Sequence, residues 1–93
     1  MKQEDMAVVR RFLDEEGRVT ALPQKQGKRR LVLSYLAEGF ACGRDYTEKE
    51  VNALLDERHT FGDFFLLRRE LCDSGLLQRE RDGSRYWRPQ KEE

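Results

Sequence analysis

Two groups of basic residues carry the clearest chemical signal in this sequence. The first group has no acid between its members and consists of Lys25, Lys28, Arg29 and Arg30. The second group lies near the C-terminal end and consists of Arg79, Arg81, Arg85 and Arg88. Lysine and arginine side chains contact the phosphates of nucleic acids, and arginines also reach the minor groove. We take all of these residues except Lys25 as candidate DNA contacts.

The same charges also have a plainer interpretation. Glu80 and Asp82 alternate with Arg79 and Arg81, as expected of ordinary solvated strand residues. Over the whole chain 18 Lys and Arg balance 18 Asp and Glu, whereas an isolated DNA-binding module is typically strongly basic. Phosphate contact and a solvated, neutralised surface are therefore both compatible with the sequence.

Residues that ligate metals or catalyse reactions are sparse. The one histidine is His59, and the two cysteines, Cys42 and Cys72, lie far apart without a CxxC pairing. We expect no metal site, reduced cysteines without a functional role, and a histidine that caps the neighbouring helix. The sequence contains no GxxxxGK[ST], HExxH or GxSxG motif. The protein is therefore predicted to have no cofactor, no catalytic residue and no enzymatic activity.

The chain of 93 residues has the size of one domain. Hydrophobic residues make up 38% and charged residues 39%, and the hydrophobic ones are spread over the whole length. This distribution favours a small folded domain with a highly charged surface. No apolar run approaches the ~20 residues of a membrane span, and no signal segment opens the chain. We expect a cytoplasmic protein without a membrane partner.

Hydrophobic spacing predicts three helices in the first two thirds of the chain. An amphipathic helix from Glu4 to Leu13 precedes a short strand between Arg18 and Pro23. A central helix from Leu31 to Phe40 is apolar on more than half of its circumference. After a loop with room for one short strand, Thr47 and Glu50 form a capping box that starts a third helix.

The last third predicts a helix followed by a hairpin. Asp63 is the expected N-cap of this fourth helix, and Gly75 suits the left-handed residue after its end. Two short strands then flank an Arg-Asp-Gly-Ser turn, whose Asp-Gly pair is a strong hairpin signal. Tyr86 and Trp87 alternate along the final strand, and we expect Trp87 to be anchored in the core.

The order of the last four elements is that of a winged helix-turn-helix domain. The predicted fold class is therefore α+β, a winged helix-turn-helix with an N-terminal helix and short strand extension. Residues 1–24 form the extension, 25–89 the winged-helix core and 90–93 a frayed tail. The helix of residues 63–74 takes the recognition position and the hairpin of residues 76–88 is the wing. Arg69, on this helix, is a further candidate DNA contact.

The outward face of the fourth helix is more apolar than that of a helix that reads base edges. A winding of ~100° per residue places Phe65 and Leu66 outward with Arg69, and puts Leu67 inward. Reading helices usually present polar groups there, whereas contiguous apolar residues mark interfaces. The alternative to DNA binding is thus a protein-interaction or dimerisation module that uses Met6, Val9, Phe65 and Leu66. A third arrangement has the N-terminal helix folded over Phe65 and Leu66.

Arg68 lies beside the apolar face of the same helix. A partly buried arginine needs an acidic partner. We expect its guanidinium to pair with an acid such as Glu38, Glu50 or Glu70, and phosphate contact is the alternative.

Four stretches of the chain resemble a known family. They are FLDEEGRVTALP at residues 12–23, YTEKEVNALL at 46–55, LRRELCDSGLL at 67–77 and RDGSRYW at 81–87. In this order they are similar to the bacterial domain of unknown function 2087. Members of that family occur as small stand-alone proteins and as partners of helix-turn-helix regulators of the arsenic-repressor type. The resemblance implies a winged-helix-like fold and a regulatory setting, and it implies no biochemical activity.

The sequence departs from the family at Phe65 and Leu66, where the resemblance leads us to expect small or polar residues. We predict a transcription-regulatory domain that binds double-stranded DNA through residues 63–74 and 76–88. Under the alternative, the partner is a second copy of the chain or another regulator, and DNA is not bound directly.

Overall fold

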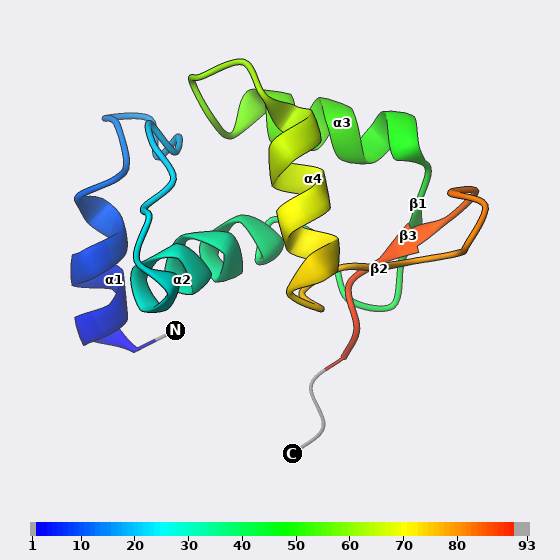
Figure 1. The fold of residues 1–93 in the computed structure, drawn as a ribbon, viewed down its shortest axis with the longest axis horizontal. Helices are drawn as coiled ribbons and strands as arrows, with labels where there is room; N and C mark the ends of the chain where they lie inside the picture. The colour runs from blue at the N-terminus through cyan, green and yellow to red at the C-terminus, as the bar shows by residue number, and fades with distance from the viewer. Residues whose placement is uncertain (1, 91–93) are drawn as a thin grey trace.

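The computed structural model describes residues 2–90, so the predicted tail of residues 90–93 lies outside the described residues except for Gln90. Within this range the fold is α+β, with four helices and one three-stranded antiparallel sheet. Figure 1 shows α1 and the β-hairpin at opposite ends of the molecule. The helices are α1 (Gln3–Arg10), α2 (Gln26–Ala37), α3 (Glu48–Glu57) and α4 (Phe64–Asp73).

The N-terminal segment is less regular than its pattern predicts. Helix α1 ends at Arg10 instead of Leu13, because the chain tightens into a turn in which the Phe12 amide donates to the Val9 carbonyl. The predicted strand between Arg18 and Pro23 does not form. Val19 instead makes isolated bridges, one to Leu13 and one to His59. These bridges fasten the segment to both α1 and the end of α3.

Helix α2 begins at Gln26, before the Leu31 that the hydrophobic pattern indicates. The dense apolar residues mark the buried part of the helix and not its start. Its first turn carries basic residues. These are compatible with helix formation, but the spacing of hydrophobic residues does not reveal them as helical. The helix ends at Ala37, and Phe40 lies beyond it in a buried position.

The predicted helix caps of α3 and α4 are confirmed. The Thr47 hydroxyl accepts from the Glu50 amide while the Glu50 carboxylate accepts from the Thr47 amide, completing the capping box. The Asp63 carboxylate accepts from the Leu66 amide. After α4, Gly75 has φ +79° and the Leu76 amide bonds back to the Leu71 carbonyl, as in a Schellman motif.

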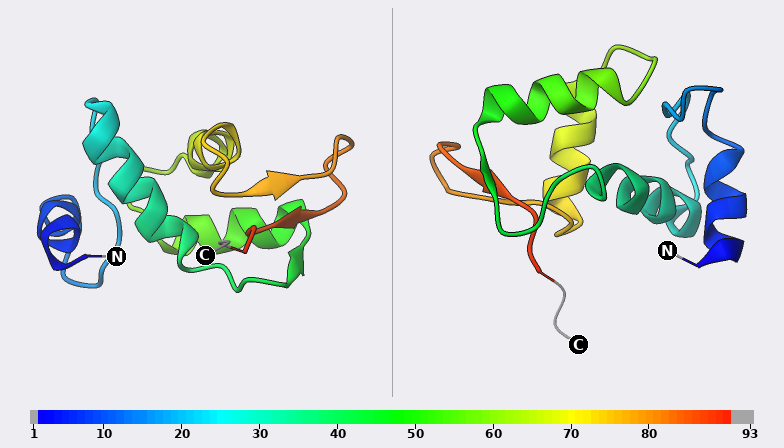
Figure 2. Two further views of the ribbon diagram at one scale, coloured as in Figure 1. Left: turned by 90° about the horizontal axis from the view of Figure 1, so that it is seen from below. Right: turned by 180° about the vertical axis from the view of Figure 1, so that it is seen from behind.

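The sheet has the order β1-β3-β2. Strand β1 (Asp45–Tyr46) pairs with the central strand β3 (Tyr86–Trp87), which also pairs with β2 (Gln78–Arg79). Both pairings are antiparallel, and β2 and β3 form the predicted hairpin. In the left view of Figure 2 the hairpin runs alongside α3, and Tyr86 of β3 bonds to Glu48 in the first turn of that helix. At its tip Gly83 takes a positive φ of 76°, which the Asp-Gly signal anticipates.

The core joins all the helices except α1 to the sheet through fully buried aliphatic and aromatic side chains. Leu67 and Leu71 of α4 are completely buried, as the helical winding predicts. Tyr86, and not Trp87, is the aromatic residue of β3 that enters the core, because the Trp87 side chain is on the other face and only half-buried. The prediction that Trp87 anchors the core is therefore wrong.

His59 is the one buried polar residue among the described residues. Its Nε2 accepts from the Asp63 amide at 2.8 Å, and its Nδ1 lies 2.5 Å from the Leu55 carbonyl. Because Nε2 accepts, the proton of the neutral ring must be on Nδ1 and donate to Leu55. The ring therefore joins the end of α3 to the start of α4, which agrees with the expected capping role.

Replacing His59 by phenylalanine preserves the aromatic contact with Phe61 but removes both polar contacts. The Asp63 amide then loses its acceptor in a partly buried position. We expect the free energy of unfolding to fall by about 1–3 kcal/mol, measured by urea denaturation. Thr60→Ala, a change at the exposed neighbouring residue, is the control and should alter it little. A His59→Phe variant as stable as the parent protein would show that the two contacts contribute nothing.

Candidate functional site

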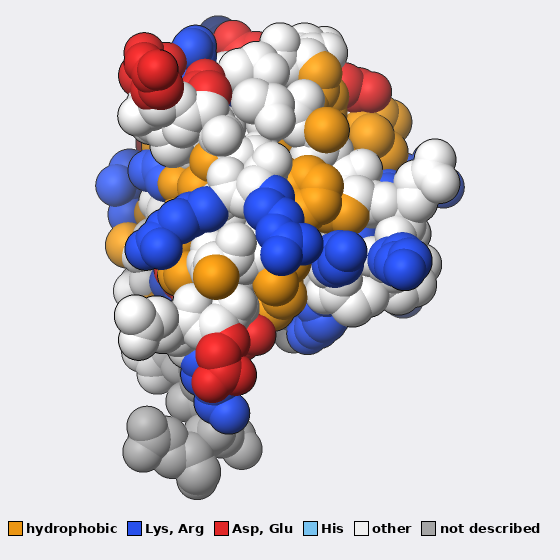
Figure 3. All heavy atoms as spheres, turned by 90° about the vertical axis from the view of Figure 1, so that its left-hand side faces the viewer, with side chains coloured by type: hydrophobic (Ala, Val, Ile, Leu, Met, Phe, Trp, Pro, Cys, Tyr) orange, Lys and Arg blue, Asp and Glu red, His pale blue; other side chains and the backbone are white. Residues whose placement is uncertain are grey.

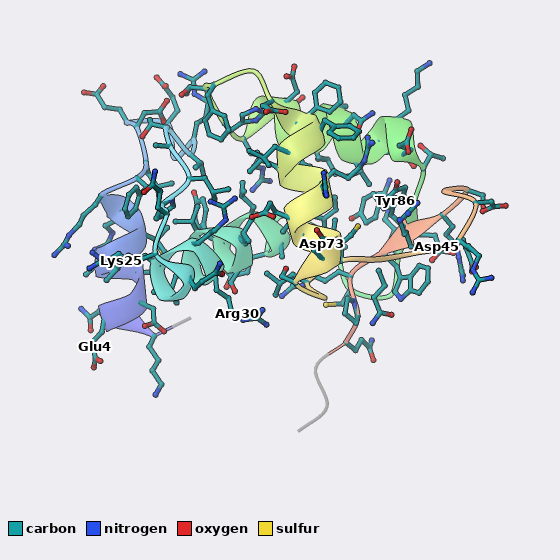
Figure 4. The ribbon with its side chains drawn as sticks, in the orientation of Figure 1. Glu4, Lys25, Arg30, Asp45, Asp73 and Tyr86 are labelled. Atoms are coloured by element: carbon teal, nitrogen blue, oxygen red, sulfur yellow. The ribbon has the colours of Figure 1, made fainter. Side chains whose placement is uncertain are left out.

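A groove between α4 and the hairpin brings together the largest concentration of cationic groups beside the predicted recognition helix. We call it the α4–hairpin groove. Its charged lining consists of Arg68 and Arg69 of α4, Arg79 of β2, and the acids Glu48 and Asp73. Figure 4 labels Asp73 and Tyr86, which lie on α4 and β3 at its two sides. Three guanidinium groups against two carboxylates leave the groove with an excess of positive charge.

Arg68 is held in place on the floor of this groove. Its guanidinium hydrogen-bonds to the Asn52 side chain, lies 3.8 Å from a Glu48 oxygen and stacks 5.1 Å from the centre of the Phe65 ring. Only 14% of the side chain is exposed. The partly buried pairing is thus present, but the predicted partners Glu38, Glu50 and Glu70 are wrong. Helix α3 presents Asn52 and Glu48 to Arg68 instead.

Arg69 and Arg79 are much more accessible than Arg68. The Arg69 side chain is 71% exposed and lies 3.8 Å from Asp73 one turn further along α4. A surface pair at this distance contributes little and leaves the guanidinium free to exchange partners. Arg79 is exposed and makes no salt bridge with any residue between 2 and 90. Both residues therefore remain candidates for an anionic ligand.

Tyr86 and Glu48 close the inner end of the groove. The Tyr86 hydroxyl donates to a Glu48 oxygen at 3.0 Å. Burial of the ring, and secondly its bond to the carboxylate, raise the pKa of Tyr86 above its ordinary value. Glu48 thus receives contacts from β3 and from Arg68 of α4, and it connects three elements at one point.

The basic group at the start of α2 divides between structural and exposed roles. Arg29 pairs with Glu70 of α4 and also donates to the Pro23 carbonyl. Arg30 donates to the Ser74 carbonyl at 3.3 Å. Lys28, which is half-buried, makes no salt bridge with the described residues. Arg29 therefore ties α2 to α4, and its charge is already neutralised.

The hairpin arginines behave differently from one another. Arg85 lies 2.5 Å from Glu80 and 3.4 Å from Asp45, and it stacks 4.6 Å above the Trp87 ring. Arg88 donates to the Phe40 carbonyl at 3.1 Å. Arg81, near the tip, is exposed without a salt bridge in the described part of the chain. Arg79 and Arg81 are thus the hairpin residues with uncommitted charge.

The residues proposed for a protein interface are also separated. Phe65 on the outer face of α4 is 59% exposed, so α1 does not cover it. Leu66 and Met6 are half-buried. Val9 is completely buried where α1 packs on α2, and it is unavailable to a partner. Phe65 is therefore the member of this set that a partner would meet first.

Within residues 2–90, no His, Cys, Asp and Glu side chains form a group of three or more that could hold a metal ion. Burial raises the pKa of the Cys72 thiol, whereas Cys42 is exposed. None of the helices described is both long and apolar enough to cross a membrane.

Sequence reasoning finds Arg69 and Arg79 but misses how the groove is built. It predicts an acidic partner for Arg68 but names Glu38, Glu50 or Glu70, and it does not connect Arg68 with Asn52, Glu48 and Tyr86. Asn52 lies one helical turn after Glu48, so both were predictable as one face of α3. Which helix that face meets depends on tertiary packing, for which the sequence holds no local signal.

The Tyr86 contact makes a pH-dependent prediction. Because the pKa of Tyr86 is raised in the folded state, the neutral phenol stabilises the folded protein fully below about pH 10, the ordinary tyrosine pKa. This stabilisation is lost as the pH rises through the folded-state pKa of Tyr86. We expect the free energy of unfolding to decline above about pH 10, and we expect Tyr86→Phe to reduce that decline. Urea unfolding at a series of pH values measures it. The control Tyr35→Phe also removes a hydroxyl hydrogen bond and should leave the decline in place. An equal decline in protein and Tyr86→Phe variant would contradict the assignment.

Comparison with known proteins gives one family. The model of an uncharacterized protein conserved in bacteria (DUF2087) matches residues 18–88, which include every element from α2 to β3. Neither a search of curated proteins nor one of solved structures gives a significant match. The match covers well over half of the chain and leaves α1 outside it. This chain therefore belongs to the DUF2087 family of uncharacterized proteins conserved in bacteria.

Proposed function

We propose that this protein is a winged helix-turn-helix domain that binds double-stranded DNA and acts in transcription regulation in the cytoplasm. The order α2-β1-α3-α4-β2-β3 supports this proposal, because it is the element order of that fold. The hairpin lies beside α4, because Arg79 of β2 and Tyr86 of β3 line one groove with residues of that helix. Helix α4 then takes the recognition position and the hairpin is the wing.

The observation that carries the proposal is the convergence of Arg68, Arg69 and Arg79 in the α4–hairpin groove. In a winged-helix complex, the recognition helix enters the major groove while flanking side chains contact the backbone. A phosphate between α4 and β2 would meet the accessible guanidinium groups of Arg69 and Arg79. Arg68, fixed by Asn52, would supply positive potential from the floor.

Several arginines are already engaged within the protein, which limits the number of DNA contacts and the expected affinity. Arg29 and Arg85 are already paired with acids, and Arg88 serves a backbone carbonyl. The proposed DNA contacts therefore reduce to the accessible groups: Arg69 and Arg79, with Arg81 at the wing tip and Lys28 and Arg30 at the start of α2. Few contacts and zero net charge imply weak binding that is visible mainly at low salt.

Replacing Arg69 and Arg79 together by alanine tests the proposal. Each lost phosphate contact removes roughly 0.9 from the slope of log K against log salt concentration. We expect the double variant to bind a fluorescent random duplex more weakly and with a slope smaller by about 2, measured by anisotropy.

The charge-matched control for this experiment is Arg44→Ala with Lys49→Ala, two exposed cations that do not line the α4–hairpin groove. The control should lose clearly less of the slope than the groove variant. Absence of binding by the parent protein at low salt, or equal slopes for the two double variants, would refute DNA binding through this groove.

The exposure of Phe65 favours a second candidate function, a dimerisation module. Among the described residues Phe65 is the one exposed large hydrophobic side chain, 59% exposed on the outer face of α4, and a partner could cover it together with its neighbour Leu66. Pairing of α4 with α4 of a second copy would bury the ring and the adjoining half-buried Leu66. This arrangement would also occupy the face that DNA would use.

Sedimentation velocity distinguishes these functions. If the protein dimerises through α4, Phe65→Asp should shift it to the monomer without lowering its helical content, because a charge cannot be buried unpaired in the contact. Phe65→Leu keeps an apolar side chain and should preserve the dimer. A protein that sediments as a monomer at the highest attainable concentration would exclude this second candidate.

A further inference from the structure

A second set of cationic side chains lies at the opposite end of the molecule from the hairpin. We call it the N-terminal basic band. It consists of Arg10 and Arg11 at the C-terminal end of α1, and of Lys25 and Lys28 at the start of α2. Figure 3, which views this end directly, shows Lys and Arg side chains as a belt across its middle. Three of the four residues are exposed, and Lys28 is half-buried.

No member of the N-terminal basic band forms a salt bridge with any residue from 2 to 90. Acids also occur at this end of the molecule, and Glu15, which is exposed, makes no salt bridge with a described residue. Asp14 and Glu16 both bond to Arg18 at 2.8 Å. Glu4 and Asp5 occupy the first turn of α1, where the helix dipole stabilises them. The four cations of the band therefore remain without an ion-pair partner among the described residues, on a chain of zero net charge.

The band has a defined position because α1 is fastened to the rest of the fold. Val9 is completely buried against α2, and the Thr20 amide bonds to the Phe12 carbonyl at 2.8 Å. Arg10 and Arg11 follow Val9 directly. They precede the family match, which begins at residue 18, so α1 adds its cations to the surface of the shared domain.

Another cation, Arg30, lies further along α2 and donates to the Ser74 carbonyl at the end of α4. The start of α2 and the end of α4 line one groove, to which Arg30 contributes; Figure 4 labels Arg30 and Lys25. A winding of ~100° per residue puts Lys28 and Arg30 on different sides of α2, so Arg30 is not a member of the band.

We propose that the N-terminal basic band is a second contact surface for the phosphate backbone of nucleic acid, which extends the footprint beyond the α4–hairpin groove. The inference rests on the proposed function for its ligand. A bilayer surface fits less well, because Phe65 is the one large hydrophobic residue classed as exposed among the described residues, and it is on α4. The hydrophobic residues Met6, Val8 and Phe12 at this end are at least half-buried.

The test compares three double alanine variants in the same salt titration with a labelled random duplex. The band variant is Arg10→Ala with Arg11→Ala, the groove variant is Arg69→Ala with Arg79→Ala, and Arg44→Ala with Lys49→Ala is the charge-matched control. Circular dichroism and urea unfolding of each variant check that the fold is retained. We expect the band variant to bind more weakly and to lose about 2 from the salt slope, with a clearly smaller loss in the control.

The outcomes separate the two proposals. A band variant that binds as tightly as the parent protein overturns this inference and leaves the α4–hairpin groove untouched. Loss of binding in the band variant with full binding in the groove variant supports the band and overturns the proposed function of the groove. No binding by the parent protein overturns both. Tighter binding to phosphatidylserine vesicles than to the duplex, lost in the band variant, would replace nucleic acid by an anionic membrane and overturn the inference.

Discussion

The complete burial of Leu67 and Leu71 fixes the rotation of α4 about its axis, and most of the candidate chemistry follows from it. Once these two side chains enter the core, Phe65 and Arg69 must face outward and Arg68 must lie at the boundary. The Asp63 cap and the Gly75 turn define where the helix begins and ends. The hairpin can then lie against the outer side of α4 and bring Arg79 to it.

Which cations of this molecule carry free charge depends on which of them pair with acids, and not on the net charge of the chain. Arg29 is matched by Glu70 across α2 and α4, and Arg85 is matched by Asp45 and Glu80 around the sheet. These pairs lie at the contacts between elements, where geometry is constrained. The cations without a salt bridge among the described residues include Arg79 beside α4 and the N-terminal basic band. A neutral chain can thus present separate positive regions, which a formal net charge of zero conceals.

Local signals in the sequence predict local structure well here. The Thr47 capping box, the Asp63 cap and the Asp-Gly hairpin all form, because each depends on backbone groups within a few residues. The start of α2 and the strand after Arg18 were wrong, because hydrophobic pattern reports burial and not helix or ladder boundaries. Part of the candidate groove is predictable from the sequence. Arg69 and Arg79 are candidates because they are arginines on the predicted fourth helix and in the predicted hairpin. The partners of Arg68 depend on how α3 crosses α4, which no short stretch specifies.

Helix α1 is less buried than the other helices, because Val9 is its one completely buried residue. Eight residues make too short a helix to persist in water without tertiary support. Its order in the folded protein therefore depends on tertiary contacts, namely the burial of Val9, the bond from the Thr20 amide to the Phe12 carbonyl and the bridge between Leu13 and Val19. Its opening would uncover the side of α2 that Val9 packs against. Because α1 buries fewer side chains completely than any other described helix, the stability of the N-terminal end depends on these few contacts with the rest of the fold.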